Sequence, residues 1–397
     1  MAKIIMHIDL NAFFVSAELL RRPELKGLPL AVGGNSRRGV ISTSSYEARR
    51  FGVKSGMPHA LAKKLCPSLI ILPPDFYYYK ELSNRFFEFI KNNYSSIIEI
   101  VSIDECYVDM TESLINIKDV KSYLKNMQLN LKKELGLGCS IGIATTKFLA
   151  KMGSDYKKPM GITIIRKRDI PTILYPLPIS DFYGIGKKTS EKLQKLGIFT
   201  IGDFASSTLK EVENELGKSY NLFKSWISGG GSDEVITYDS DPKSISSSST
   251  FLYDTDDYEE ILESLKEQAR DVEYGLKKHN LIALTIHITL RDSEFHTITR
   301  SKTLPFPLER KEDIYEKGVE LFDNNWTEIP LRLVGIGVSS LHKKENFMVQ
   351  LSLFDYQYMD EIKTRSLIKN INAKMHKEVL MTGKDLLKMK ENKDGTK

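Results

Sequence analysis

Residues 97–110 read IIEIVSIDECYVDM, two runs of apolar and β-branched residues interrupted by a pair of acids. Such runs are typical of β-strands, here Ile97–Ile103 and Cys106–Met110. The interruption by Asp104 and Glu105 predicts a hairpin with both carboxylates at its tip. A carboxylate pair beside so apolar a strand must be solvated or bound to a cation.

A second strand places another acid at its end. The segment Ile4–Leu10 reads as a strand in which Asp9 is the last polar residue. Phosphoryl transfer uses divalent metal ions, which prefer carboxylate oxygens fixed on rigid strand ends. Asp9, Asp104 and Glu105 are therefore candidate metal ligands. The alternative is that Asp9 caps the following helix and that the other two are ordinary turn acids.

The rest of residues 1–166 alternates short strands with helices. Further strands are predicted at Leu28–Val32, Gly39–Thr43, Ser140–Ala144 and Ile162–Ile165, the last at a sheet edge. Helices are predicted at Tyr46–Phe51, Pro58–Leu65, Tyr77–Tyr94, Val120–Leu135 and Lys147–Ser154. The alternation predicts an α+β domain whose strand ends carry acids.

Two more regions follow. Pro171–Pro178 breaks the chain, and only helices are predicted from there to Ile227. Gly229–Ser232 and Asp239–Ser249 have the Gly, Ser, Pro and Asp content of linkers. Residues 250–342 then predict the order β-α-β-β-α-β, a self-contained domain. After its first strand, its elements are expected at Tyr258–His279, Ile282–Arg291, His296–Leu304, Lys311–Trp326 and Arg332–Ser340.

Length and composition indicate a multidomain globular protein. The 397 residues suggest two to four domains, and 41% hydrophobic with 27% charged residues exclude collagen, a disordered chain and a membrane bundle. No run approaches the roughly 18 apolar residues of a membrane span, and the start lacks a secretory signal. Three scattered cysteines show neither a pairing pattern nor zinc spacing, which favours a reducing cytosol.

The net charge of +5 is unevenly distributed. Residues 1–241 carry 33 basic and 26 acidic side chains, residues 242–355 carry 14 and 20, and residues 356–397 carry 10 and 6. The balances are therefore +7, −6 and +4. A basic front and a basic tail are consistent with a nucleic-acid partner.

Four motifs occur in order along the chain. They are IDLNAFFVSAE at 8–18, STSSYEARRFGVKSGMP at 42–58, SIDECYVD at 102–109, and SIGIA at 140–144, the last followed by Lys147, Lys151, Lys158-Pro159 and Gly161. Together they resemble the signature motifs of Y-family translesion DNA polymerases, the DNA polymerase IV (DinB)–UmuC group. The resemblance covers about residues 1–355.

The resemblance implies an α+β multidomain fold of the right-hand polymerase type. The palm, with a mixed sheet, would comprise residues 1–11 and 76–166, and small fingers residues 12–75. A helical thumb would span 167–232, and a β-α-β-β-α-β little finger 242–355. The basic C-terminal tail, 356–397, remains outside this scheme; it could pack on the body, contact DNA or bind another partner.

The resemblance also implies the catalytic residues. In the family, the equivalents of Asp9, Asp104 and Glu105 hold two Mg²⁺ ions, with the carbonyl of Leu10 as a further ligand. Such ions bridge the triphosphate, lower the pKa of the primer 3′-hydroxyl and neutralise the pyrophosphate.

The nucleotide pocket follows from the same motifs. Phe14 matches the family's steric gate, the ring that excludes a 2′-hydroxyl, although it could also be a core aromatic. The backbone amides of Asn11, Ala12 and Phe13 are expected to meet the phosphates.

Three polar side chains and an ammonium suit a triphosphate. Tyr46 and Arg49 share a helix face, Thr43 precedes them, and Lys158 supplies the ammonium. The small residues Ser42 and Ser44 would leave a roomy pocket, which in the family accompanies low fidelity.

Residues 183–198 read YGIGKKTSEKLQKLGI, a pattern typical of a helix-hairpin-helix element, with a simple helical turn as the alternative. Gly184 and Gly186 would let the backbone approach a DNA phosphate, and Lys187 lies at the helix N-terminus.

The domain at 242–355 concentrates its acids on helices, and its strands carry Arg291, Arg300, Lys302 and Arg332. Arg300 and Lys302 have the same strand parity, so they are expected on one basic sheet face that binds DNA.

A short peptide ends this domain. Gln350, Leu351, Leu353 and Phe354 resemble the peptide by which bacterial polymerases dock on the sliding clamp, the beta subunit; a last apolar strand is the alternative.

The sequence therefore predicts an error-prone DNA-directed DNA polymerase that adds dNTPs to a primer on a DNA template. Its expected role is translesion synthesis in DNA repair, as a mutator without proofreading. A nucleotidyl cyclase and a catalytically inactive DNA-binding repair accessory are the alternatives. The helix-hairpin-helix element argues against the first, and the complete acid triplet argues against the second. We expect a monomer in the bacterial cytoplasm, associated with the nucleoid and without membrane contact.

Overall fold

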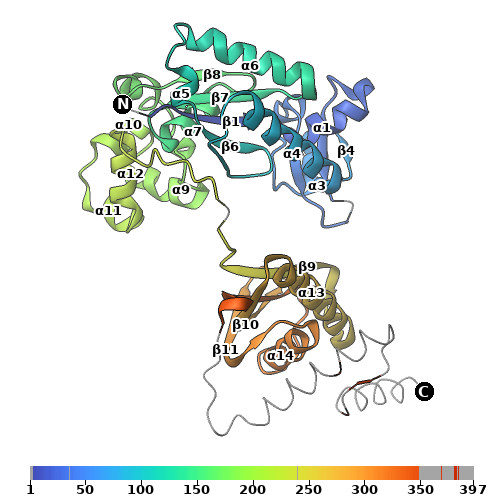
Figure 1. The fold of residues 1–397 in the computed structure, drawn as a ribbon. Coiled ribbons are helices and arrows are strands. Elements are labelled where there is room, and N and C mark those ends of the chain that lie inside the picture. Colours follow the sequence, from blue (N-terminus) through green and yellow to red (C-terminus); the bar gives the residue numbers. More distant parts are fainter. Residues whose placement is uncertain are drawn as a thin grey trace. The chain divides into compact units, whose positions relative to one another are not determined.

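The computed structural model describes residues 3–34, 36–238 and 240–347, together with Ile368, Leu380, Met381 and Gly383. The chain divides into two compact units, Met1–Ser240 and Asp241–Lys397, and each unit is described by itself (Figure 1). None of the described helices is long and apolar enough to cross a membrane.

A five-stranded sheet forms the centre of the first unit, in the order β5-β6-β1-β7-β8. The strands are β1 (Ile5–Leu10), β5 (Ile98–Ile100), β6 (Glu105–Asp109), β7 (Cys139–Ala144) and β8 (Ile162–Ile164). β1 is antiparallel to both β6 and β7, and β8 pairs with β7 at the sheet edge, as predicted. All six residues of β1 are buried because the central strand is covered on both faces.

The hairpin predicted around the acid pair is confirmed. β5 and β6 pair antiparallel, with Ile100 opposite Cys106. Residues 101–104 connect them, so Asp104 lies in the turn and Glu105 is the first residue of β6.

Seven helices in the described part of residues 1–160 surround this sheet and a smaller one. They are α1 (Phe13–Arg21), α2 (Tyr46–Arg49), α3 (His59–Leu65), α4 (Phe76–Asn93), α5 (Thr111–Leu114), α6 (Val120–Leu135) and α7 (Lys147–Tyr156). α6 has the predicted bounds because both of its ends are marked in the sequence. Asp119 caps it by accepting from the Ser122 amide at 3.0 Å, and Gly136, with φ 71°, ends it.

The side chains of β1 alternate between two packed faces. Met6 belongs to a core that α4 and α6 cover, and Ile5 belongs to the core on the other face, which includes α7. Because a strand alternates with a period of two, His7 and Asp9 lie on the α7 side.

The smaller sheet has the order β3-β2-β4, with β2 (Leu30–Gly33), β3 (Ile41–Ser44) and β4 (Ile70–Leu72). The sequence did not predict β4. Three residues are too few to show a period, and β4 is held by parallel pairing with the distant β2.

The all-helical region predicted to follow Pro178 and to end at Ile227 is confirmed, and one further short helix, α8 (Ile170–Ile173), begins before it and overlaps the break predicted at Pro171–Pro178. The helices of the region are α9 (Lys187–Lys195), α10 (Ile201–Ser206), α11 (Lys210–Leu216) and α12 (Ser219–Ile227). Phe182 joins this layer to α7, since its ring centroid lies 5.0 Å from that of Phe148 and 5.8 Å from that of Phe204.

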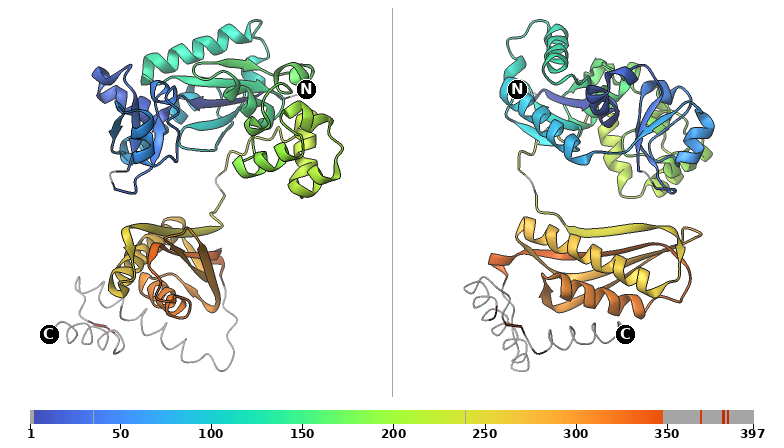
Figure 2. Two further views of the ribbon diagram at one scale, coloured as in Figure 1. Left: turned by 180° about the vertical axis from the view of Figure 1, so that it is seen from behind. Right: turned by 90° about the vertical axis from the view of Figure 1, so that its right-hand side faces the viewer.

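The second unit is the predicted β-α-β-β-α-β domain (Figure 2). Its sheet has the order β11-β10-β12-β9, formed by β9 (Ser244–Thr255), β10 (Leu281–Asp292), β11 (Thr297–Leu308) and β12 (Leu331–Lys343). The helices α13 (Tyr258–His279) and α14 (Lys311–Asp323) pack on one face of this sheet.

The serines at 246–249 were expected in a linker, and this expectation is wrong. They belong to β9, where Ser246 pairs with Gly337 and Ser248 with Gly335 of β12. Composition suggested a linker, but a neighbouring strand supplies the hydrogen-bond ladder, and Ile245 packs against the core.

Candidate active site

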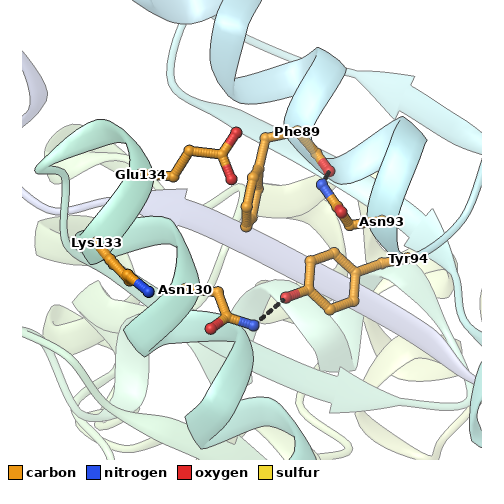
Figure 3. Close-up of a pocket in the computed structure, with 6 residues that line it drawn as sticks. All are labelled: Phe89, Asn93, Tyr94, Asn130, Lys133 and Glu134. Atoms are coloured by element: carbon orange, nitrogen blue, oxygen red, sulfur yellow. Dashed lines mark hydrogen bonds between the residues drawn. The ribbon is translucent and has the colours of Figure 1, made fainter.

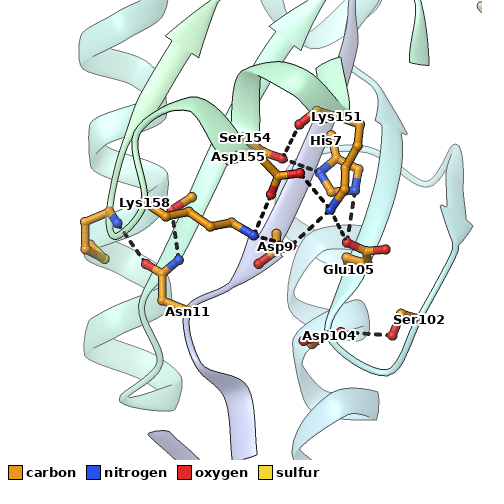
Figure 4. A network of polar contacts seen from close by, with 12 residues as sticks. His7, Asp9, Asn11, Ser102, Asp104, Glu105, Lys151, Ser154, Asp155 and Lys158 are labelled. Carbon is orange, nitrogen blue, oxygen red and sulfur yellow. Dashed lines mark hydrogen bonds and ion pairs between the residues drawn. The ribbon is translucent and has the colours of Figure 1, made fainter. Parts of the chain in front are cut away.

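Pairing within the sheet brings the predicted acids to one end of it. Asp9 on β1 lies directly opposite Glu105 on β6. The Leu10 amide donates to the Asp104 carbonyl at 3.0 Å, which holds the turn against the end of β1. The three carboxylate residues thus come from two adjacent strand ends (Figure 4).

Two lysines reach these carboxylates from α7 and from the loop after it (Figure 4). Lys151 Nζ lies 2.6 Å from Glu105 Oε2 and 3.3 Å from Asp9 Oδ2. Lys158 Nζ lies 2.7 Å from the same Asp9 oxygen and 2.7 Å from Asp155 Oδ1. Sequence reasoning quoted Lys151 in the fourth motif but gave it no role in the site, because it lies 142 positions from Asp9. Asp155, which pairs with both lysines, was not singled out.

The ammonium groups set the ionisation of the site. Burial alone would raise the pKa of Asp9, but Lys158 and Lys151 outweigh it and lower that pKa. Burial raises the pKa of Glu105, and Lys151 opposes this rise. Burial alone would lower the pKa of Lys151 and of Lys158, but the surrounding carboxylates outweigh it and raise the pKa of both. At neutral pH, Asp9 is ionised and both lysines are charged.

The Asp104 carboxylate is bound by Ser102 and forms no ion pair with either lysine of the described site. Its Oδ1 accepts a hydrogen bond from Ser102 Oγ at 2.9 Å, and burial together with the charge of Asp9 raises its pKa. In the part of the chain that the structure describes, no three Asp, Glu, His or Cys side chains converge on one point as ion ligands. The acids share a sheet end but do not enclose a common site.

The donor set nevertheless suits hard divalent cations. Asp155 adds a third carboxylate to the ion-pair network, so two ammonium groups face three carboxylates, and Asp104 lies at the same end of the sheet. Full ionisation therefore leaves an excess of negative charge at a largely buried position. Carboxylate oxygens are the ligands that Mg²⁺ prefers.

His7 is a buried member of the site that sequence reasoning did not single out. Its Nδ1 lies 2.8 Å from Ser154 Oγ, and this hydroxyl donates to the Lys151 carbonyl at 2.9 Å, so Nδ1 carries the hydrogen. Burial, aided by Lys151, lowers the pKa of His7 well below its usual value, and the ring is neutral. Its spacing of two residues from Asp9 was the available signal.

Asn11 holds the loop that carries Lys158. Its Nδ2 donates to Ser140 Oγ at 2.8 Å, and its Oδ1 accepts from the Met160 amide at 2.8 Å. The side chain therefore joins the start of β7 to the loop two residues beyond Lys158.

The backbone amide of Asn11 does not face a ligand. It donates to the Gly138 carbonyl at 2.8 Å, so the prediction that it meets a phosphate is wrong. Ala12 adopts φ 45° just before α1. The amides of Ala12 and Phe13 form no backbone hydrogen bond with the residues that the structure describes.

Phe14 lies at the start of α1, half-buried, on a base of aromatic rings. Its ring stacks on Tyr79 with centroids 4.5 Å apart and planes inclined by 14°, and Phe76 meets it edge-on at 6.0 Å. The Tyr79 hydroxyl donates to Glu18 Oε1 at 2.8 Å. The Phe14 ring, the candidate steric gate, is therefore held in place by the rings around it.

Tyr46 and Arg49 are adjacent, as their spacing predicts. Arg49 Cζ lies 4.7 Å from the Tyr46 ring centroid, and Arg49 Nε donates to the Ser44 carbonyl at 3.0 Å. The Tyr46 hydroxyl is buried, and no described group meets it in hydrogen-bonding geometry. Burial raises the pKa of Tyr46. A buried hydroxyl without a partner beside a guanidinium suits an anionic ligand. Thr43 lies on β3, which leads into this helix.

The two glycines of the helix-hairpin-helix candidate differ in their surroundings. Gly184 has φ 98°, and a Cβ there would lie 3.2 Å from the Phe223 ring. A Cβ at Gly186 would meet nothing within 4 Å, so its backbone faces open space. Lys187 begins α9 with its side chain 89% exposed.

The expected basic face of the second unit is only partly present. Arg300 and Lys302 do share one face, but they lie opposite the buried Ile288 and Ile286, on the side that the helices cover. Lys302 forms an ion pair with Glu320 of α14. Strand parity predicts that two residues share a face and does not reveal which face it is.

The other two strand arginines have different partners. Arg332 forms a bidentate pair with Asp254, at 3.1 and 3.2 Å, and lies 4.4 Å from the Phe295 ring centroid. Arg291 Nε donates to Thr297 Oγ1 at 2.8 Å. Of the four cations, Arg291 is the one whose side chain bonds to a neighbour on the face away from the helices.

Hydroxyl groups line that face instead. The register aligns two rows across the strands: Ser246, Gly337, His287 and Ser301, and then Ser248, Gly335, Thr289 and Thr299. A larger residue would not fit at Gly337 on this face, because a Cβ there would lie 2.5 Å from His287 Nε2. Neutral hydroxyls can bind DNA phosphates. Sequence reasoning looked for charged residues and therefore missed this face. The available signal was that serine or threonine occupies alternate positions of β9 and β11, as Ser246 and Ser248 do in β9.

The predicted clamp peptide, with Gln350, Leu351, Leu353 and Phe354, lies outside the described residues. The same is true of most of the tail, residues 356–397.

Family comparisons match this chain along most of its length. Residues 8–155 match the impB/mucB/samB family, residues 242–353 its C-terminal domain, and residues 167–198 the IMS family HHH motif. DNA polymerase IV 1 of Bacillus subtilis (strain 168) is 40% identical over 401 residues, covering 100% of this chain and 96% of the relative. DNA polymerase IV of Alkaliphilus oremlandii (strain OhILAs) is 40% identical over 378 residues, covering 93% and 92%.

Solved structures agree with these matches. A Y-family DNA polymerase chimera of Dbh and Dpo4 superposes with a TM-score of 0.74 at 27% identity, covering 85% of this chain and 98% of the chimera. DinB from Sulfolobus solfataricus gives a TM-score of 0.57 at the same identity and coverage. The chain therefore belongs to the impB/mucB/samB family and is a Y-family translesion DNA polymerase.

Proposed function

We propose that this DNA-directed DNA polymerase extends a primer by nucleotidyl transfer, with Asp9, Asp104 and Glu105 holding two Mg²⁺ ions. Dependence on a divalent metal in general follows from the family. The number of ions and their ligands are inferred from the site. The observation that carries the proposal is the excess of negative charge where three carboxylates meet two lysines, with a further acid, Asp104, at the same end of the sheet.

The ligands would come from both strand ends. Asp9 and Glu105 face each other across β1 and β6, and the Leu10 carbonyl follows directly. Asp104 would exchange its hydrogen bond with Ser102 for a metal ligand bond. When bound, the ions supply the charge that stabilises the triphosphate and lowers the pKa of the primer 3′-hydroxyl. Lys151 and Lys158 would then be released from the carboxylates.

The nucleotide would lie between α1 and α2. Tyr46, Arg49, Thr43 and Lys158 would hold the triphosphate, and the buried unpartnered Tyr46 hydroxyl supports this role. The amides of Ala12 and Phe13 would add backbone contacts.

Sugar selection would fall to Phe14, whose ring is fixed by Tyr79. A ring held in this way can exclude a 2′-hydroxyl by its bulk.

The domain scheme is part of the proposal. All five strands of the central sheet fall within residues 1–11 and 76–166, assigned to the palm. The small sheet falls within the fingers, 12–75, and α8–α12 fall within the thumb, 167–232. The little finger, 242–355, begins next to the division between the two units at Asp241.

Primer-template DNA would be gripped by two surfaces. In the thumb, Gly184, Gly186 and Lys187 would meet a phosphate through backbone and ammonium. In the little finger, Arg291 and the two hydroxyl rows would contact the backbone without reading sequence. Arg300, Lys302 and Arg332 would contribute only at the strand edges, since Lys302 and Arg332 are paired with acids.

The partners and the setting complete the proposal. The enzyme would act as a monomer without proofreading, near the bacterial nucleoid. It would dock on the sliding clamp through Gln350–Phe354. Deletion of those five residues should abolish stimulation by the clamp and leave basal extension intact; a deletion variant that the clamp still stimulates would disprove the docking role.

Primer extension tests the metal assignment. Asp104→Ala and Glu105→Ala should abolish extension with Mg²⁺ on undamaged and lesion-containing templates, while fluorescence anisotropy shows unchanged DNA binding. Glu112→Gln, an exposed acid in α5, is the matched control and should extend normally. Extension by either alanine variant would refute the assignment.

A further inference from the structure

We propose that the first unit binds an acidic peptide segment of a partner protein, at the end of its central sheet opposite the catalytic acids. A hollow of about 460 Å³ lies there. It is lined by Leu114 and by the segments 3–4, 118–121, 143–145 and 164–167. The five residue-to-residue steps from Ile4 to Asp9 span roughly 16 Å at the usual strand rise. A ligand in this hollow would therefore not occupy the catalytic centre.

Three strand ends build the hollow. Ile5 pairs with Ala144, which places the beginning of β1 beside the end of β7. The Ile165 amide donates to the Ile143 carbonyl at 2.8 Å, which places the end of β8 beside them. The floor is thus fixed by backbone hydrogen bonds and does not depend on flexible side chains.

The floor is apolar. Ile143 and Leu114 are buried, and Ile4 and Ile164 are half-buried and line the hollow from three different elements. Binding of an apolar side chain on this floor would be favourable by about 25 cal/mol for each Å² of apolar surface removed from water.

The rim carries five cations and one acid. The cations are Lys3, Lys118, Lys121, Arg166 and Lys167, and the acid is Asp119. The Asp119 carboxylate is already engaged, since it accepts from the Ser122 amide at 3.0 Å and from the Ser122 hydroxyl at 2.6 Å. Within residues 3–34, 36–238 and 240–347, no carboxylate forms an ion pair with any of the five cations.

An apolar floor inside an unneutralised basic rim complements a peptide that combines acidic and apolar side chains. Charge complementarity would steer the peptide, and the apolar anchor would hold it. A single-stranded nucleic acid fits less well, because binding of that kind relies on aromatic rings for base stacking. No aromatic residue is among the described residues that line the hollow.

A second hollow in the same unit shows the contrast. It has about 340 Å³ between α4 and α6 and is lined by Phe89, Asn93, Tyr94, Asn130, Lys133 and Glu134 (Figure 3). Its two charges balance, so it has no preference for an acidic partner. It provides a control, because Lys133 lies on α6 like Lys121 but outside the basic rim.

The test is fluorescence anisotropy with the full chain and a fluorescein-labelled peptide of four aspartates followed by Leu-Phe with a free carboxyl end. We expect saturable binding to the wild type. The double variant Lys121→Glu/Lys167→Glu should weaken it by about tenfold or more, and Lys133→Glu should leave it unchanged. A peptide with asparagine in place of aspartate, and one with Ala-Ala in place of Leu-Phe, should each lose most of the affinity. Unchanged primer extension by the double variant would show that it is folded.

Several results would overturn the proposal. The first is the absence of saturable binding up to about 1 mM peptide. The second is a Lys133→Glu variant that weakens binding as much as the double variant does, and the third is an asparagine peptide that binds as tightly as the aspartate peptide. Displacement of the peptide from the hollow by oligo-dT at equal molar concentration would identify a nucleic-acid site instead, and displacement by millimolar inorganic phosphate would identify a simple anion site. Because the assay contains no metal, primer or nucleotide, its outcome is independent of the catalytic proposal.

Discussion

Asp9 and Glu105 face each other across β1 and β6, and one ammonium, Lys151 Nζ, lies 3.3 Å from the first carboxylate and 2.6 Å from the second. The lysine neutralises a position that would otherwise hold two opposed negative charges. The Lys151 side chain is only 12% exposed, so solvent screens this charge weakly. The lysine and a divalent cation would therefore compete for the same carboxylates.

Replacing Lys151 with Met should make the folded state depend on metal. Without divalent ions, the variant should lose about 3 kcal/mol of unfolding free energy, because Glu105 loses its lysine partner and Asp9 keeps only Lys158. Adding Mg²⁺ or Mn²⁺ should stabilise the variant more than the wild type, because only Lys158, and no longer Lys151, has to be displaced from the carboxylates. Thermal unfolding with and without metal measures both effects. Lys157→Met, at an exposed neighbouring position, should change neither; equal metal stabilisation of Lys151→Met and wild type would contradict the competition.

The sequence predicted the elements that carry their own boundary signals. The helices at Val120–Leu135 and Tyr258–His279 have the predicted bounds, and both begin after a capping aspartate, Asp119 or Asp257. The acids were correctly placed at adjacent strand ends, because two short motifs fix both the strands and the turn. Local signals of this kind agree with the final fold, so the elements that they mark can be predicted from the sequence.

What could not be predicted depends on distant contacts. Lys151 reaches Asp9 only because α7 packs on β1. The amide of Asn11 is taken by Gly138, a partner that no local pattern reveals. Parity placed Arg300 and Lys302 on one face, but the helices that cover that face are set by the packing of the whole unit.

Phe14→Ala should relax sugar selection. The ring is held by stacking on Tyr79 at 4.5 Å, so its removal leaves a space that neighbouring residues cannot refill. We expect discrimination between dNTP and rNTP to fall by about 100-fold, the order by which a pocket excludes an added hydroxyl. Steady-state kcat/KM for matched dNTP and rNTP pairs measures it. Phe14→Leu keeps much of the bulk and should retain most of the selectivity; unchanged selectivity in Phe14→Ala would remove the gate role.

Gly142→Ala should damage the site from a distance. A Cβ at Gly142 would lie 1.9 Å from the Ala150 carbonyl oxygen and 2.4 Å from the Ser154 amide, both in the backbone of α7. The helix that carries Lys151 must then move away from β7. We expect a loss of about 1–3 kcal/mol in unfolding free energy, together with reduced primer extension. Gly34→Ala, where a Cβ meets nothing within 4 Å, should have no such effect in the same denaturation and extension assays. Wild-type stability of Gly142→Ala would show that β7 and α7 do not pack this closely.

Glu320 should make the stability of the second unit depend on pH. Hydrogen bonds from Lys302 and Lys317 lower its pKa from 4.5 to about 2 in the folded state. A carboxylate with a lowered folded pKa contributes stability that is complete above its unfolded pKa and is lost as the pH falls toward the folded value. We therefore expect Glu320→Gln to cost about 1 kcal/mol or less at pH 7, allowing for solvent screening, and this cost should shrink steadily between about pH 5 and pH 2. Urea unfolding of wild type and variant at pH 7 and pH 3.5 measures the difference, with the exposed Glu328→Gln as the control that shows none. A cost that is the same at both pH values would mean that the ion pairs of Glu320 with Lys302 on β11 and with Lys317 on its own helix do not stabilise the second unit.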